Sequence, residues 1–163
     1  MNQELLLAAD NWGQIALRLG AATLAGILIG LDREWRGHDA GIRTHALVAL
    51  SSAAIMLSSL LLYEAARNED VNPDPLRAVQ GLAQAIGFLV AGLIFVRRAT
   101  VKNMTTAANL WMAAALGIAC GAGQYRLAVV ATGFTLILLV IFPFVERMIP
   151  EKRDAVEERD PRR

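Results

Sequence analysis

The stretch LAVVATGFTLILLVIFPFV, residues 127–145, contains no charged side chain and is nearly long enough by itself to cross a lipid bilayer. The hydrocarbon core of a bilayer is about 30 Å thick, and a helix needs about 20 residues to cross it. Four other apolar runs approach this length, at residues 12–31, 44–63, 76–96 and 105–123. The sequence therefore predicts an all-α, polytopic membrane protein with five transmembrane helices.

Charged residues are scarce and lie mainly between these runs. Hydrophobic residues make up 55% of the 163 residues and charged residues 19%, against about a quarter charged in a soluble domain. We predict a transmembrane domain at residues 1–146 and a charged tail at 147–163. No Lys or Arg precedes the first run, so we expect a retained helix instead of a cleaved signal. The one cysteine, Cys120, lies in an apolar run, which predicts a buried, inert thiol.

The basic residues predict the orientation of the chain in the membrane. Twelve Lys and Arg lie in the connections after the first and third runs and in the tail, whereas three lie in the segments assigned to the other side. Cytoplasmic loops carry the excess of Lys and Arg. We therefore expect the N-terminus outside and the C-terminus in the cytoplasm, with a tight antiparallel hairpin between the fourth and fifth runs.

Small residues recur at intervals of four in three of the runs, which places each set on one helix face. Such faces let helix backbones approach closely in lipid. This pattern predicts that the first, third and fourth runs form an inner cluster, while the fifth faces lipid on most sides. The alternative is that these glycines line a gate or an ion path. The residues are Ala22, Gly26 and Gly30 in the first run, Ala83, Gly87 and Ala91 in the third, and Ala113, Gly117 and Gly121 in the fourth.

Charged residues follow the first run directly, at Asp32, Arg33, Glu34 and Arg36. Oxygen ligands suit Mg²⁺, so Asp32 and Glu34, with His38 and Asp39 nearby, are weak candidates for a metal site. The interleaved arginines would repel a cation, and we expect local ion pairs instead. Arg18, inside the first run, is expected to extend its guanidinium toward the outer surface.

Polar residues also open the fourth run. Thr105 and Thr106 are expected to cap free backbone N–H groups, and Asn109, followed by Trp111, must find a partner inside the bundle; solute binding is the alternative. The chain has no phosphate-binding G-x-x-x-x-G-K-[ST] motif and no nucleophile with a recognisable base. We therefore expect no enzymatic activity and no cofactor, with Mg²⁺ the one ion to consider. Nothing in the sequence resembles a nucleic-acid-binding motif.

Two blocks of sequence resemble the MgtC/SapB family of bacterial inner-membrane proteins. The first is GILIGLDREWRGHDAGIRTHALVAL, residues 26–50, which is similar to a GxxIGxxRE start followed by AGxRTxxLV and includes Arg43 and Thr44. The second runs from residue 87 to 123 and includes the series T-T-A-A-x-L-W. Val90 stands where the family usually has glycine, and Asn103-Met104 where Gly-Leu is usual. The chain resembles the shorter type, without the C-terminal soluble domain of the virulence-associated members.

The resemblance implies a multi-pass inner-membrane protein associated with growth at low Mg²⁺. It further implies regulation of another membrane protein, the F-type ATP synthase or a cation transporter. The leading hypothesis is therefore a non-enzymatic regulator that contacts the lipid bilayer and another inner-membrane protein, with a homodimer as a further expectation. The alternative is a small oligomeric Mg²⁺ or cation channel or carrier, with a path along Asp32, Glu34, Thr106 and Asn109. A structural or lipid-interacting role is a third hypothesis.

Overall fold

The computed structural model describes residues 11–38, 40–67, 73–97 and 100–148. Its five helices are each long and apolar enough to cross a membrane, which confirms the predicted all-α fold and number of spans. The predictions for the first ten residues, for Asp39 and for the tail from residue 149 onward concern residues outside the described part of the chain. The helices are α2 (Trp12–Trp35), α3 (Ile42–Ala66), α4 (Leu76–Leu93), α5 (Met104–Gly121) and α6 (Tyr125–Met148).

Two helix ends differ from the predicted runs. Helix α2 continues to Trp35, so Asp32, Arg33 and Glu34 lie on its last turn and not in a loop. Helix α4 ends at Leu93, three residues before the end of the third run. Two short strands follow it, β1 (Phe95–Arg97) and β2 (Thr100–Lys102), paired antiparallel with Val96 opposite Val101. This strand pair was not predicted from the sequence; its β-branched valines fit an extended backbone.

Glycines in the left-handed conformation end two of the helices. Gly37 (φ 71°) follows α2 and Gly123 (φ 75°) follows α5. At each end the next residue donates its N–H to a carbonyl in the last turn: His38 to Arg33 at 3.0 Å, and Gln124 to Ala119 at 2.8 Å. This pairing satisfies carbonyls that the helix leaves free, and glycine is the residue that adopts such a backbone without cost. The second of these ends produces the predicted tight turn into α6.

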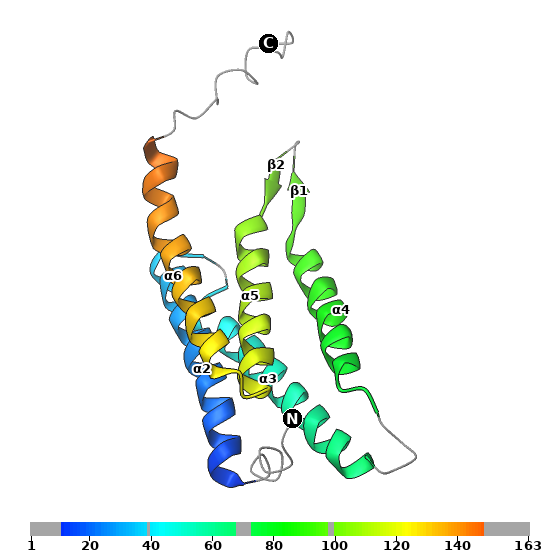
Figure 1. Ribbon diagram of the computed structural model, residues 1–163. Helices are drawn as coiled ribbons and strands as arrows, with labels where there is room; N and C mark the ends of the chain where they lie inside the picture. Colours follow the sequence, from blue (N-terminus) through cyan, green and yellow to red (C-terminus); the bar gives the residue numbers. More distant parts are fainter. Residues whose placement is uncertain (1–10, 39, 68–72, 98–99, 149–163) are drawn as a thin grey trace, which may run out of the picture.

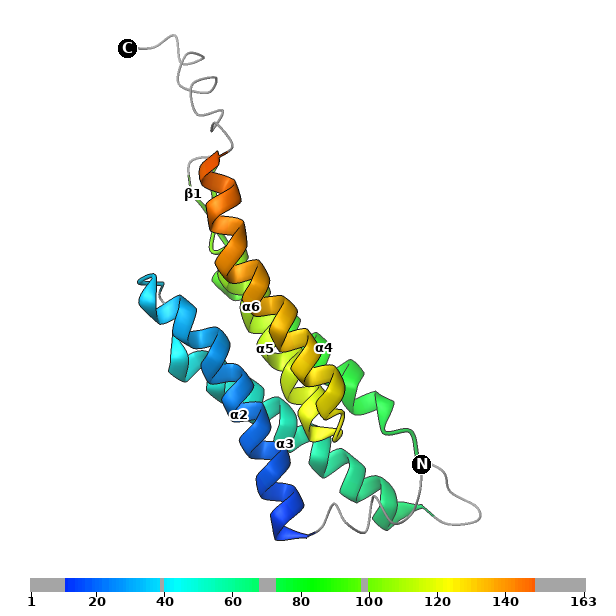
Figure 2. The same cartoon turned by 60° about the vertical axis from the view of Figure 1, so that its left-hand side comes forward.

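Helices α2, α3 and α5 form the centre of the bundle, and α4 and α6 flank it (Figures 1 and 2). The prediction that the third run belongs to the inner cluster is wrong, because α4 buries only Leu82. The second run, α3, takes that place. It buries Ala49, Ala53 and Leu57 among other residues, while Gly81 and Gly92 of α4 have no neighbour within 4 Å of a Cβ position.

Glycines of α2 and α5 pack directly on the backbone of α3. A Cβ atom at Gly26 would lie 2.6 Å from the carbonyl oxygen of His45, and one at Gly30 would lie 2.6 Å from Cα of Ile42. Gly121 approaches the carbonyl of Ala53 at 2.5 Å in the same way, and Gly117 approaches that of Ala49. Helix α3 is therefore the common partner of both glycine faces.

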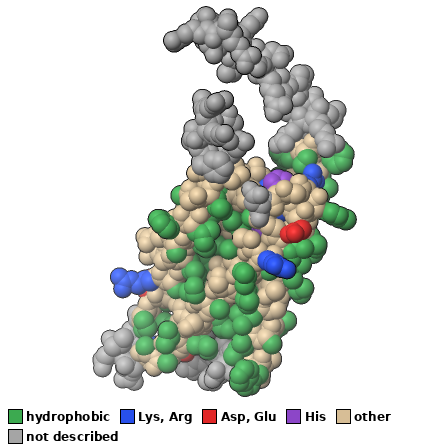
Figure 3. All heavy atoms as spheres, turned by 180° about the vertical axis from the view of Figure 1, so that it is seen from behind, with side chains coloured by type: hydrophobic (Ala, Val, Ile, Leu, Met, Phe, Trp, Pro, Cys, Tyr) green, Lys and Arg blue, Asp and Glu red, His purple; other side chains and the backbone are tan. Residues whose placement is uncertain are grey.

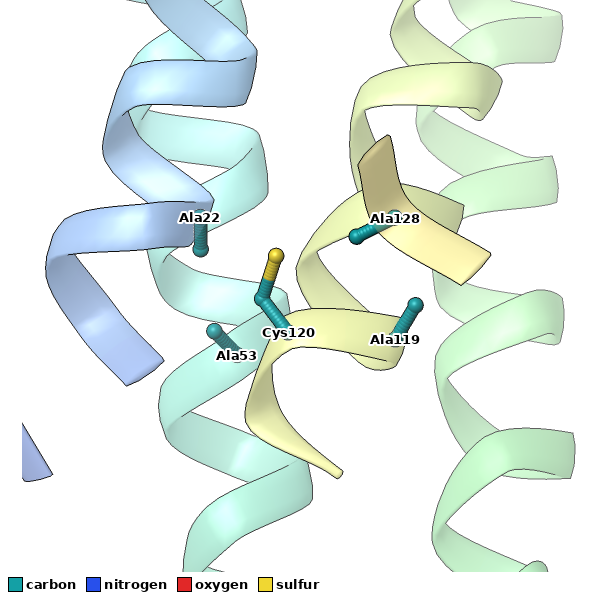
Figure 4. Packing of buried hydrophobic residues seen from close by; sticks show 5 residues of the cluster. All are labelled: Ala22, Ala53, Ala119, Cys120 and Ala128. Atoms are coloured by element: carbon teal, nitrogen blue, oxygen red, sulfur yellow. The ribbon is translucent and has the colours of Figure 1, made fainter. Parts of the chain in front are cut away.

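Toward the turn between α5 and α6, the centre of the bundle is built from alanines around Cys120. The thiol is free and buried, as expected from its place in an apolar run. Figure 4 shows Cys120 and Ala119 of α5 with Ala22 of α2, Ala53 of α3 and Ala128 of α6, so that four helices meet at this point. Small side chains here allow the four backbones to converge.

Candidate functional site at the basic end of the bundle

The polar residues of interest gather at one end of the bundle, where α2 ends and α3 and α5 begin. We call it the basic end, because Arg33, Arg36 and Arg43 lie there. Figure 1 places the α2–α3 connection, the β1–β2 pair and the last turns of α6 toward this end. Much of the face seen in Figure 3 carries hydrophobic side chains and few charged ones. This is the end that the charge count assigns to the cytoplasm; the orientation in the membrane stays a prediction.

Arg33 is the central residue of this cluster. Its side chain lies inside the bundle, with 4% exposure, and its Nη2 donates a hydrogen bond of 2.9 Å to Oγ1 of Thr106 on α5. Thr106 is itself buried, and its hydroxyl accepts from a guanidinium. The bond joins residues 73 positions apart in sequence and ties the end of α2 to the start of α5. The capping role predicted for Thr105 and Thr106 is wrong, because α5 begins at Met104 after the N-cap residue Asn103, whose side chain makes no capping hydrogen bond.

Glu34 joins α2 to the start of α3. Its Oε2 accepts a hydrogen bond of 3.1 Å from the backbone N–H of Ile42, which is one of the free donors of the first turn of α3. A Cβ atom at Gly41 would overlap this carboxylate, so the glycine makes room for the contact. Glu34 is thus used as a helix cap, which differs from the ion pairing expected from the sequence.

Asp32 and Arg36 connect α2 to α6. Arg36 forms an ion pair of 2.9 Å with Asp32 one turn earlier, and its Nη2 lies 3.4 Å from the carbonyl oxygen of Leu139. Pro143 stands four residues after Leu139 inside α6. Because proline has no N–H, it leaves that carbonyl without its helical partner. The guanidinium of Arg36 supplies a donor to an acceptor that Pro143 has freed.

Two further polar side chains are buried nearby. His45 of α3 is fully buried, and its Nδ1 lies 2.8 Å from the carbonyl oxygen of Gly41. Asn109 of α5 has 7% exposure. Within the part of the chain that is described, Nε2 of His45 and Nδ2 of Asn109 have no hydrogen-bond partner, nor do Nε of Arg33 and Oδ2 of Asp32.

The remaining predicted residues are not buried in this cluster. Arg43 and Thr44 are exposed on the first turn of α3, and Thr105 is exposed at the start of α5. Trp111 packs its ring against Gly87 of α4, 3.4 Å from a Cβ position, and marks the contact between α4 and α5. Ala91 is exposed on α4, so it takes no part in the inner packing expected of it.

The ion pair between Asp32 and Arg36 agrees with the local pairing expected from the sequence. Sequence reasoning missed the contact of Arg36 with Leu139 and the burial of His45, and it gave Arg18 a different role. Instead of extending to the outer surface, Arg18 has 7% exposure and donates a 2.9 Å hydrogen bond to the carbonyl of Gly121. A cation at the C-terminal end of α5 compensates the free carbonyls and the negative end of the helix dipole. The bundle therefore holds one buried arginine toward each end.

The described carboxylates of this end, Asp32 and Glu34, each have a partner within the protein. Among the described residues no group of three or more His, Cys, Asp or Glu side chains could hold a metal ion. Asp32 is paired with Arg36, and Glu34 is engaged by a backbone N–H. The weak candidates for Mg²⁺ are thus separated and already partnered.

Five apolar helices around a core of small residues define a multi-pass helical membrane protein. The chain belongs to the MgtC family, whose pattern matches residues 19–148. It is 43% identical to Protein MgtC of Salmonella typhimurium (strain 14028s) over 117 residues, which are 71% of this chain and 47% of that protein. This finding agrees with the resemblance seen in the sequence.

Two other relatives bear different names. The chain is 36% identical to the "Putative magnesium transporter YhiD" of Escherichia coli (strain K12), over 79% of this chain and 60% of that protein. It is 37% identical to Protein SrpB of Synechococcus elongatus, over 88% of this chain and 83% of that protein. The chain therefore spans less than two thirds of YhiD and MgtC. No solved structure matches it.

Proposed function

We propose that this chain is a bacterial inner-membrane protein that takes part in adaptation to low Mg²⁺ by regulating another membrane protein, without enzymatic chemistry. The family and the magnesium-related name of the relative YhiD support the link to Mg²⁺. The partner expected from the resemblance is an ATP synthase or a cation transporter. The argument for regulation over transport comes from the interior of the bundle.

The observation that carries this proposal is the charge of the buried groups. Both charged side chains buried in the described bundle are arginines, Arg18 and Arg33. A buried guanidinium in a medium of low dielectric constant repels a cation strongly. Arg33 lies beside Thr106, on the path that a cation would have to follow past Thr106 and Asn109.

The outer face of α4 supplies a surface for a partner. Phe88 is 86% exposed, and Gln80 and Gln84 are exposed on the same helix. Glutamine amides that face hydrocarbon without a partner carry a desolvation cost, and interhelical hydrogen bonds from such side chains hold membrane helices together. A neighbouring membrane protein that accepts these amides would lower that cost.

The alternative function is a cation channel or carrier, which the name of YhiD favours. The two hypotheses differ in a direct measurement of Mg²⁺ uptake by proteoliposomes that contain only the purified chain. Asp32→Asn removes the carboxylate that pairs with Arg36 at the basic end. Its matched control is Glu64→Gln on α3, where Glu64 is paired with Arg67 at 3.8 Å. We expect no uptake above empty liposomes for the wild type or either variant.

Uptake that depends on the protein and falls in Asp32→Asn alone would refute the regulatory proposal. Contact with a partner is measured separately, with a photo-crosslinking residue at Phe88 or, as the control, at buried Leu82, in cells grown at low Mg²⁺. We expect an adduct with one identified membrane protein at Phe88 and none at Leu82. Equal labelling at both positions would argue against α4 as the contact surface.

A further inference from the structure

A cavity opens at the basic end of the bundle between α2, α5 and α6. Its volume is about 280 Å³. Asp32, Arg33, Arg36 and His38 line it from the α2 side, and Thr105 lines it from the start of α5. Its remaining wall is apolar and comes from α6: Leu138, Leu139, Phe142 and Pro143.

The described lining of the cavity carries a net positive charge. Asp32 is the one carboxylate among the described lining residues, and it is paired with Arg36 at 2.9 Å. Arg33 has no carboxylate within ion-pair distance among those residues, and its Nε has no acceptor although its side chain is 96% buried. A buried guanidinium is stable only with a compensating anion or a full set of hydrogen bonds.

The start of α5 adds a second feature that attracts an anion. No side chain caps the N-terminus of this 18-residue helix, and Thr105 in its first turn lines the cavity. Free N–H groups and the positive end of the helix dipole make such a terminus a site for negative charge. The Thr105 hydroxyl is a further donor on the same wall.

We propose that this cavity binds a phosphate group, carried either by a phospholipid headgroup or by a soluble phosphate. Arg33 and Arg36 contribute guanidinium N–H donors, which match phosphate oxygens in pairs, and Thr105 contributes a hydroxyl. Asp32 keeps Arg36 oriented and leaves the site with a net positive charge. This inference does not rest on the regulatory function proposed above.

The apolar wall is the feature that a lipid would use. Leu138 and Phe142 are about half exposed on α6, and that helix continues away from the cavity along the apolar surface of the bundle. An acyl chain can follow this surface while its phosphate lies at the level of Arg36. A soluble phosphate would need the polar side of the cavity only.

The test uses the full chain, purified in a maltoside detergent and stripped of lipid. The probes are a phosphatidylglycerol, a diacylglycerol with the same chains but no phosphate, and inorganic phosphate. Native mass spectrometry measures retained lipid, and thermal unfolding measures binding of inorganic phosphate. The variants are Arg36→Gln and Arg33→Gln, and the matched control is Arg43→Gln, which removes an exposed arginine at the same end without touching the cavity.

We expect Arg36→Gln to weaken phosphatidylglycerol binding about tenfold, the effect of losing one charge-assisted hydrogen bond. Arg43→Gln should bind like the wild type, and diacylglycerol should not be retained. Binding of inorganic phosphate that is lost in Arg36→Gln would assign the same site to a soluble phosphate. Equal binding by wild type, Arg36→Gln and Arg33→Gln, or an equal loss in Arg43→Gln, would overturn the proposal. Since Arg36 is partly exposed, its variant tests the site even if Arg33→Gln does not fold.

Discussion

Replacement of Gly26 by alanine tests whether the contact between α2 and α3 is as close as the structure indicates. A Cβ atom at this position would lie 2.6 Å from the carbonyl oxygen of His45 and 2.8 Å from Cα of Ala46. Both neighbours are backbone atoms, so no side chain can turn aside to make room. The added methyl group must push the two helices apart.

The size of the effect follows from these distances. Ordinary Cβ contacts begin at 3.4 Å, so the helices must separate by about 0.8 Å at this point, which forfeits a quarter to a half of the dispersion energy of the adjoining contacts. Overpacking of this kind costs about 1–3 kcal/mol, and alanine returns about 0.5–1 kcal/mol through its better helix propensity. We expect a net loss of about 0–2.5 kcal/mol in the free energy of unfolding, with a middle value of about 1 kcal/mol.

The assay is reversible unfolding in mixed micelles, with increasing dodecyl sulfate and tryptophan fluorescence as the signal. Gly133→Ala is the control, because a Cβ atom there meets nothing within 4 Å. That variant should be as stable as the wild type or more stable by about 0.5–1 kcal/mol. If Gly26→Ala were as stable as Gly133→Ala, the close contact with α3 would be wrong.

Three further substitutions test single contacts by the same unfolding assay. Thr106→Val removes the acceptor of buried Arg33 and should cost about 1.5–3 kcal/mol; no loss would mean that the guanidinium has another partner. Pro143→Ala restores a helical N–H to the carbonyl that Arg36 contacts, so Arg36→Gln should destabilise the wild type more than it destabilises Pro143→Ala. Asn103 has φ 64°, and both Asn103→Ala and Asn103→Gly remove the hydrogen bond from its Nδ2 to the carbonyl of Leu93. Asn103→Ala should therefore be less stable than Asn103→Gly by about 1–2 kcal/mol. Equal loss in both would remove backbone conformation as the reason for asparagine there.

The number of helices and their approximate limits could be predicted from hydropathy alone, because each span must be apolar over the thickness of the bilayer. Which helices occupy the centre could not. The pattern of small residues at intervals of four identified the glycine faces of α2 and α5. It did not identify α3, the helix against which both faces pack. Helix α3 contributes its backbone through Ala49 and Ala53. Of the residues predicted on α4, Gly87 contacts only the ring of Trp111 and Ala91 is exposed.

The sequence indicated which polar residues belong to the site, but not which of them contact one another. Arg33, Glu34 and Thr106 were named from the sequence, yet nothing in it joins Arg33 to a threonine 73 positions away. One signal was available and not used: a proline inside a helix leaves the carbonyl four residues before it free. That rule identifies Leu139 as an acceptor, although it does not identify Arg36 as the donor. The glycine that the family resemblance leads one to expect at position 103 would suit the positive φ that Asn103 adopts.

The position of α3 between two glycine faces has a consequence for how the protein assembles in the membrane. Gly26 and Gly30 meet α3 within the first two spans, so these helices can pair as soon as both have been inserted. Gly117 and Gly121 require the fourth span, and α4 must be inserted before it yet adds little to the core. We therefore expect the α2–α3 hairpin to form during synthesis and to expose a groove of alanine and serine backbone. We expect α5 to cover that groove late in synthesis. Until α5 is inserted, quality-control proteases have access to the unfinished protein.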